Sequence, residues 1–135
     1  MRLAVDANVL FSAMLREGLT RRLYFDRRLL LYAPRFLLKE FGKYAAELQK
    51  RSRLPKKEFV ELCRMLLSRI RWVPDEEILP FIPAARHLCT DEKDAPYLAC
   101  ALAAGADLWS RDRDLRQPRV KIWETSELAE WLETQ

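Results

Sequence analysis

The chain has 135 residues, of which half are apolar, a third are charged and only three are glycine, and its net charge is +4. This composition is typical of one compact domain and excludes disordered and fibrous proteins. No apolar stretch reaches membrane-spanning length, and the first residues lack the pattern of a signal peptide, so we expect a cytoplasmic protein.

Short apolar runs alternate with helical patterns along the chain. Strands are predicted at residues 2–5, 29–33, 71–73, 106–110 and 120–124. Helices are predicted at about residues 9–25, 35–51, 55–69, 76–88, 94–104 and 126–133. This alternation indicates an α/β domain whose central parallel sheet has about five strands and is flanked by helices on both faces.

The charges are unevenly distributed. From Arg16 to Arg71 there are 16 basic and 6 acidic residues, a net charge of +10, whereas from Pro74 to Gln135 there are 7 basic and 13 acidic residues, a net charge of −6. The basic part predicts a surface that attracts a polyanion, although a solvated helical surface would show a similar pattern.

Acidic residues stand at strand ends and helix starts. Asp6 follows the first predicted strand, Asp112 and Asp114 follow the fourth, Asp94 opens the helix before the fourth, and Glu40 lies one turn inside the helix after the second. Ligands of parallel sheets collect at the carboxyl ends of the strands, so we expect these acids on one side of the sheet. Clustered carboxylates favour Mg²⁺ or Mn²⁺, and such ions promote hydrolysis of phosphate esters.

Each acid also has an ordinary structural explanation. Asp6 could cap the helix that follows it, Asp91 and Asp94 could cap the helix before the fourth strand, and Asp112 could be a turn residue. Glu40 could pair with a lysine on a solvated helix face. The sequence alone leaves these alternatives open for every acid taken singly.

Cysteine and histidine contribute little to the predicted chemistry. Cys63, Cys89 and Cys100 are widely spaced, and His87 is the only histidine. This set supports neither a disulfide framework nor a zinc site, so we expect the cysteines to be small core residues and His87 to be structural.

Four segments resemble the PIN-domain family, in particular VapC-like ribonuclease toxins of type II toxin–antitoxin systems: VDANVLFSA, LLKEFGKY, DEKDAPYLACALAAGADLWSRDRDL and VKIWETSEL. The third is the most specific, because an aspartate opening a helix of small residues, then GAD, a strand and S-x-D-x-D-L occur at the family's spacing. The resemblance runs nearly end to end and implies a single PIN-like nuclease domain over residues 1–135.

The resemblance implies a Mg²⁺- or Mn²⁺-dependent endoribonuclease that cuts single-stranded RNA, and a cognate antitoxin as partner. The catalytic and metal-binding residues that it implies are Asp6, Glu40, Asp94 and Asp112, with Asp114 replacing or assisting Asp112. Two further residues, Asn8 and Ser110, would support the site by hydrogen bonds.

The densest basic cluster is predicted to guide RNA to the acids, and it consists of Lys50, Arg51, Arg53, Lys56 and Lys57. The same cluster would also suit an acidic segment of an antitoxin, and the sequence does not separate the two. A homodimer is expected because PIN toxins usually pair and because the four tryptophans, at positions 72, 109, 123 and 131, exceed what a small core readily buries.

Two other kinds of protein fit part of the pattern. A catalytically weak or inactive PIN fold that binds RNA or protein is the alternative function, and the complete set of four acids argues against it. A phosphoacceptor receiver domain has the same alternation of strands and helices, but it needs an acidic pair after the first strand, where this chain has Asp6 alone.

Overall fold

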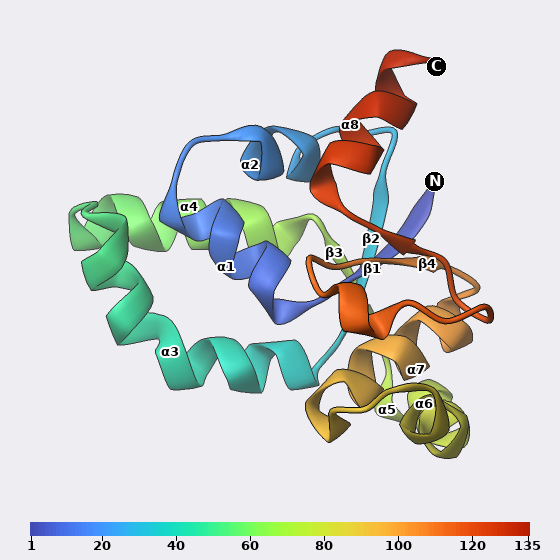
Figure 1. Cartoon of the computed structure of the whole chain (residues 1–135). Helices are drawn as coiled ribbons and strands as arrows, with labels where there is room; N and C mark the ends of the chain where they lie inside the picture. The colour runs from blue at the N-terminus through green and yellow to red at the C-terminus, as the bar shows by residue number, and fades with distance from the viewer.

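A five-stranded parallel β-sheet organises the chain, and the computed structural model describes all of residues 1–135 (Figure 1). The strands are β1 (Arg2–Val5), β2 (Leu30–Pro34), β3 (Ile70–Val73), β4 (Asp107–Trp109) and β5 (Ile122–Trp123). Their order across the sheet is β3-β2-β1-β4-β5, and every neighbouring pair is parallel. The predicted fold class and number of strands are therefore confirmed.

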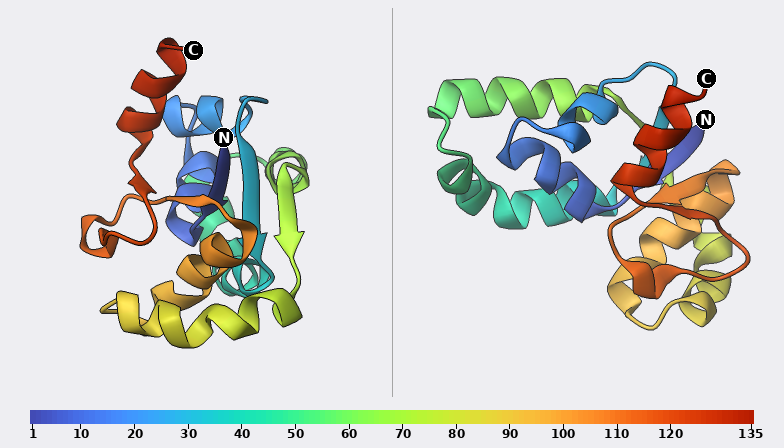
Figure 2. Two further views of the ribbon diagram at one scale, coloured as in Figure 1. Left: turned by 90° about the vertical axis from the view of Figure 1, so that its right-hand side faces the viewer. Right: turned by 45° about the horizontal axis from the view of Figure 1, so that its top comes forward.

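Helices connect the strands and cover both faces of the sheet. They are α1 (Ala7–Leu15), α2 (Leu19–Tyr24), α3 (Phe36–Ser52), α4 (Lys56–Ser68), α5 (Asp75–Ile78), α6 (Ile82–Leu88), α7 (Ala95–Ala104) and α8 (Thr125–Glu133), with short 3-10 turns η1 (Leu79–Phe81), η2 (Glu92–Asp94) and η3 (Arg113–Leu115). The chain runs outward from β1 to β3 and then returns past β1 to β4. Because parallel crossovers are right-handed, this reversal places α5, α6 and α7 on the face opposite α1 and α2 (Figures 1 and 2).

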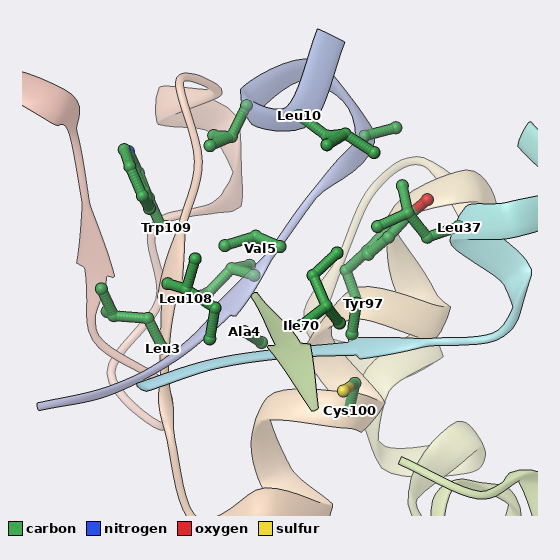
Figure 3. Packing of buried hydrophobic residues seen from close by; sticks show 14 of the residues in the cluster. Leu3, Ala4, Val5, Leu10, Leu37, Ile70, Tyr97, Cys100, Leu108 and Trp109 are labelled. Carbon is green, nitrogen blue, oxygen red and sulfur yellow. The ribbon is translucent and has the colours of Figure 1, made fainter. Parts of the chain in front are cut away.

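Helix α7 lies directly on the sheet and contributes most to its buried face. It contacts β1, β2, β3 and β4, and its sequence APYLACALAA buries residues 95 and 97–101. The small side chains let the helix axis approach the strands closely, while Tyr97 and Cys100 fill the remaining space among the sheet residues (Figure 3). The helix ends at Gly105, which adopts the left-handed conformation at φ 60°.

The helix expected at residues 9–25 is instead two helices, so that prediction was wrong in its extent. Arg16, after the last residue of α1, is extended, and Gly18 precedes α2. The Arg21 guanidinium turns back and donates to the carbonyl oxygens of Ala13 (2.7 Å) and Met14 (3.4 Å). These bonds satisfy the free carbonyls at the end of α1, which makes the break stable.

The helix expected at residues 76–88 is also interrupted. Pro80 lies in η1 and Pro83 in the first turn of α6, so the segment divides into α5, η1 and α6. A proline lacks the backbone N–H that an uninterrupted helix needs at these positions.

Helices α3 and α4 project away from the sheet and enclose α1 between them (Figures 1 and 2). The chain reverses between them at Arg53, the one non-glycine residue with a positive φ, at 60°. All five residues of the predicted basic cluster, Lys50, Arg51, Arg53, Lys56 and Lys57, are exposed at this far end.

The four tryptophans belong to the core or its edge. Trp109 is fully buried and Trp123 is 8% exposed, while Trp72 and Trp131 are half-buried against the core. The expectation that tryptophan exceeds what the core can bury was therefore wrong, and the homodimer stays a prediction. No helix is both long enough and apolar enough to cross a lipid bilayer.

Candidate functional site

The chain first adds β2 and β3 on one side of β1 and then returns to add β4 on the other side, so β1 and β4 are neighbours. Val5 of β1 pairs with Trp109 of β4, so Asp6 and Ser110 follow at the same level. The Asp6 N–H donates to the Trp109 carbonyl oxygen at 3.4 Å and closes the end of this strand pair. This is the position at which open parallel sheets collect ligands.

Asp6 uses both of its carboxylate oxygens. Oδ1 accepts a hydrogen bond from the Val9 N–H (3.0 Å) and thereby caps α1, while Oδ2 accepts from the Ser110 hydroxyl (2.5 Å). Burial raises the pKa of the Asp6 carboxyl; the Ser110 and Val9 hydrogen bonds oppose the shift, and the Asp112 charge adds to it. The capping explanation is correct for Asp6, and the same side chain still faces other acids.

Ser110 connects the first acid to the loop after β4. Its Oγ donates to Asp6 and accepts from the Asp112 N–H at 3.1 Å. Asp112 Oδ1 in turn accepts from the Asp114 N–H at 2.9 Å, which shapes the η3 turn. Asp112 is half-buried and its charge acts on Asp6, whereas Asp114 is exposed at the surface.

Two aspartates near the start of α7 behave differently. Asp91 is a cap: its Oδ1 accepts from the Lys93 N–H at 3.0 Å. Asp94 stands at the N-cap of α7, but its side chain makes no capping hydrogen bond. The capping explanation therefore holds for Asp91 and fails for Asp94.

The pKa of Asp94 shows that several acids share one region. It is raised from 3.8 to about 6, first by burial and then by the negative charges of Asp112, Asp91, Asp6 and Glu40. Because like charges act strongly only at short range in a protein, the acids expected to gather at one edge of the sheet lie within electrostatic reach of one another.

Glu40 is held by a residue that the sequence did not single out. The Tyr97 hydroxyl donates to Glu40 Oε1 at 2.5 Å, and the Tyr97 ring packs edge-on against Phe36 with centroids 5.9 Å apart. Figure 3 shows Tyr97 rising from α7 beside Leu37, with its oxygen directed toward the start of α3. Tyr97 lies one helical turn after Asp94, and this spacing was the signal available in the sequence. An aromatic residue in an apolar helix is, however, first interpreted as a core residue.

The donor set fits a hard divalent cation, although the side chains do not converge on one. None of the four acids Asp6, Glu40, Asp94 and Asp112 pairs with a lysine or arginine. Carboxylates in a partly desolvated cluster without a basic counterion are suitable ligands for Mg²⁺ or Mn²⁺. In this structure, however, no three acidic, cysteine or histidine side chains lie close enough together to hold an ion.

The other residues predicted to have a functional role lie on different surfaces of the protein. Asn8 is exposed in the first turn of α1 and lines a groove with Asp112 and Arg51. Lys56 lines a separate apolar groove between α3 and α4. The predicted basic cluster is therefore divided between two surfaces. His87 is exposed on α6.

Comparison with known proteins places the whole chain in one family. The chain resembles the structure of PAE2754 from Pyrobaculum aerophilum, with a TM-score of 0.67 and 20% identity over 100% of this chain and 91% of that one. It also resembles a toxin–antitoxin complex from Klebsiella pneumoniae, with a TM-score of 0.66 and 16% identity over 91% of this chain and 97% of that one. The search of curated proteins found no match. The PIN domain profile matches residues 4–133, and the chain therefore belongs to the PIN-domain family.

Proposed function

We propose that this protein is a Mg²⁺- or Mn²⁺-dependent endoribonuclease and the toxin of a toxin–antitoxin pair. The observation that carries the proposal is the shared electrostatic environment of Asp6, Asp94 and Asp112 at the reversal point of the sheet. PIN domains are generally nucleases, and one structure with this fold is a toxin–antitoxin complex, which supports both parts of the proposal.

In this proposal Asp6, Glu40, Asp94 and Asp112 are the catalytic residues and hold the cation. A bound cation would supply a site for the phosphate and a water of lowered pKa. Ser110 and the Val9 N–H each donate to one oxygen of Asp6, and Ser110 also accepts from the Asp112 N–H. Tyr97 fixes one oxygen of Glu40, so Glu40 and Asp112 each keep one carboxylate oxygen that accepts no hydrogen bond from the protein.

The alternative, an inactive PIN fold that only binds RNA or protein, differs in one chemical respect. It needs no cluster of like charges, because phosphate binding is served by basic residues alone. The protein instead retains several carboxylates that raise the pKa of Asp94, at a cost to stability. Cleavage that appears with Mn²⁺ and stops with a chelator separates the two functions.

The antitoxin has a suitable docking surface on the outer side of α3 and α4. The apolar groove there has a volume of about 510 Å³ and includes Phe41, Phe59 and the 45%-exposed Val60. Lys56 and Arg64 stand along it. This combination suits an amphipathic helix that carries acidic residues beside its apolar face.

The acids of the η3 turn give a matched pair of substitutions. Asp112→Asn should reduce Mn²⁺-dependent cleavage of a fluorescently labelled single-stranded RNA by about a hundredfold or more, because a metal-facing charge is lost. Asp114→Asn removes the same charge from the exposed neighbour and should leave cleavage near the wild-type rate. Cleavage near the wild-type rate in Asp112→Asn would remove Asp112 from the proposed site, and a loss in Asp114→Asn alone would assign its role to Asp114.

Asp94→Asn should stabilise the metal-free protein at pH 7. The folded-state pKa of about 6 lies above the ordinary 3.8, so ionisation of Asp94 lowers stability as pH rises through that interval. The variant escapes this loss, which we place at about 1 kcal/mol because the carboxyl is partly solvated. Thermal melts in a chelator should therefore show a higher Tm for the variant at pH 7 and equal values below pH 3.8.

The same melts test the cation. Mn²⁺ should raise the Tm of the wild type, by mass action on the folded state, and that of Asp94→Asn much less. The exposed Glu133→Gln is the control and should change neither the Tm nor its Mn²⁺ response. If Asp94→Asn lowers the Tm without metal and keeps the full Mn²⁺ response, Asp94 is only a structural residue.

Tyr97→Phe tests the positioning of Glu40. The substitution keeps the ring against Phe36 and removes the hydroxyl that donates to Glu40, so the folded structure is retained. The Mn²⁺ concentration needed for half-maximal cleavage should rise about tenfold, as expected when a ligand loses its supporting hydrogen bond. Tyr32→Phe is the control, because Tyr32 lies on β2 and its hydroxyl makes no hydrogen bond to an acid. A Mn²⁺ dependence identical in both variants would leave Tyr97 a core residue only.

Two exposed apolar residues of α4 test the antitoxin surface. Val60 lines the apolar groove, whereas Met65, 49% exposed, does not. Co-purification with the product of an adjacent reading frame should be lost in Val60→Glu and retained in Met65→Glu. Retention in both variants would show that the antitoxin binds elsewhere, and absence of any co-purifying product from wild type would contradict the partner.

A further inference from the structure

A polar groove of about 720 Å³ extends from the acids along α1. Its wall on α1 is a single stripe of side chains at helical spacing, Asn8, Phe11, Ser12 and Leu15. This stripe rises by about 10 Å along the helix axis. Asp112 is the one candidate catalytic acid among the lining residues, so the groove meets the proposed site at this residue.

Three arginines from different parts of the chain line this groove. Arg111 adjoins Asp112 at the acidic end, Arg16 follows the last residue of α1, and Arg51 lies in the last turn of α3. All three are exposed, and none forms an ion pair with a carboxylate. A guanidinium without a protein partner is well suited to hold a phosphate through two parallel hydrogen bonds.

Two aromatic rings lie where α1 and α3 meet. Phe11 lines the groove, and Tyr44 packs edge-on against it with ring centroids 5.9 Å apart. Tyr44 is 38% exposed although most large apolar side chains of the protein are covered. Tyr44 is not itself a lining residue, and the Lys43 ammonium lies 6.0 Å from its ring centroid. An exposed aromatic ring with a basic side chain beside it is the arrangement on which an unpaired base stacks.

We propose that this groove binds the single strand on one side of the cut bond. Arg16 and Arg51 hold phosphates at the end away from the acids, Arg111 holds one near them, and Tyr44 stacks a base. The identification of the strand as RNA rests on the proposed function. An acidic peptide fits less well, because its carboxylates would meet Asp112 and the other acids at the far end of the groove.

Binding measured in a chelator separates the groove from catalysis. Fluorescence anisotropy with a short labelled single-stranded RNA should show about tenfold or greater loss of affinity in Arg16→Gln/Arg51→Gln. The slope of log affinity against log salt concentration should fall by about 1.4, as expected for two lost phosphate contacts to a single strand. Tyr44→Ala should weaken binding about fivefold or more with the slope unchanged, whereas Tyr44→Phe should bind like the wild type.

The control is Arg27→Gln/Arg119→Gln, which removes the same charge from exposed residues outside this groove. A loss of affinity and slope equal to that of Arg16→Gln/Arg51→Gln would show diffuse attraction and overturn the groove. If Arg16→Gln/Arg51→Gln loses antitoxin co-purification while its RNA affinity is unchanged, the groove binds the protein partner, and this outcome also overturns the proposed RNA groove. If either of these two outcomes is found and the wild type still shows metal-dependent cleavage, the groove proposal fails and the proposed function stands. If RNA binds the groove as expected but no cleavage is seen, only the proposed function is contradicted.

Discussion

Like charges gathered at one edge of a sheet repel one another, and the surrounding structure has to hold them against that repulsion. The pKa of Asp94 is raised to about 6, first by burial and then by the neighbouring negative charges. A network of short contacts supplies the restraint: Ser110 links Asp6 to the loop after β4, and Tyr97 links α7 to Glu40. The core beneath them, with α7 seated on four strands, gives these contacts a rigid base.

Local and functional roles coincide in the same side chains. Asp6 caps α1 with one oxygen and meets Ser110 with the other, and Asp112 shapes a turn while its charge acts on Asp94. Capping explains where such a residue stands, because a strand end or helix start needs an acceptor for free N–H groups. It does not explain why several of them lie within electrostatic reach of Asp94. The contrast between Asp91, which caps, and Asp94, which does not, separates the two roles within four residues.

The sequence was sufficient for the parallel sheet, which follows from strand–helix alternation. The site residues stay a prediction, which the charges of Asp6 and Asp112 acting on Asp94 support. The sequence was insufficient where tertiary contacts determine where a helix ends or which side chains are buried. The break after α1 depends on Arg21 reaching the carbonyls of Ala13 and Met14, and burial of the tryptophans depends on how strands and α8 pack. Tyr97 was missed because its hydroxyl finds Glu40 only when α3 and α7 are brought together, at a separation of 57 residues.

The division of the basic residues between two grooves could not be predicted from the sequence. Arg51 and Lys56 are close in sequence, yet one lines the polar groove that contains Asp112 and the other the apolar groove between α3 and α4.

The proposed function depends on Asp6, Glu40, Asp94 and Asp112 holding one cation. Anomalous X-ray scattering from crystals grown with Mn²⁺ tests it most directly. The expected result is a Mn²⁺ ion coordinated by oxygens of these carboxylates, and crystals at a saturating Mn²⁺ concentration with no ion at them would overturn the proposed site.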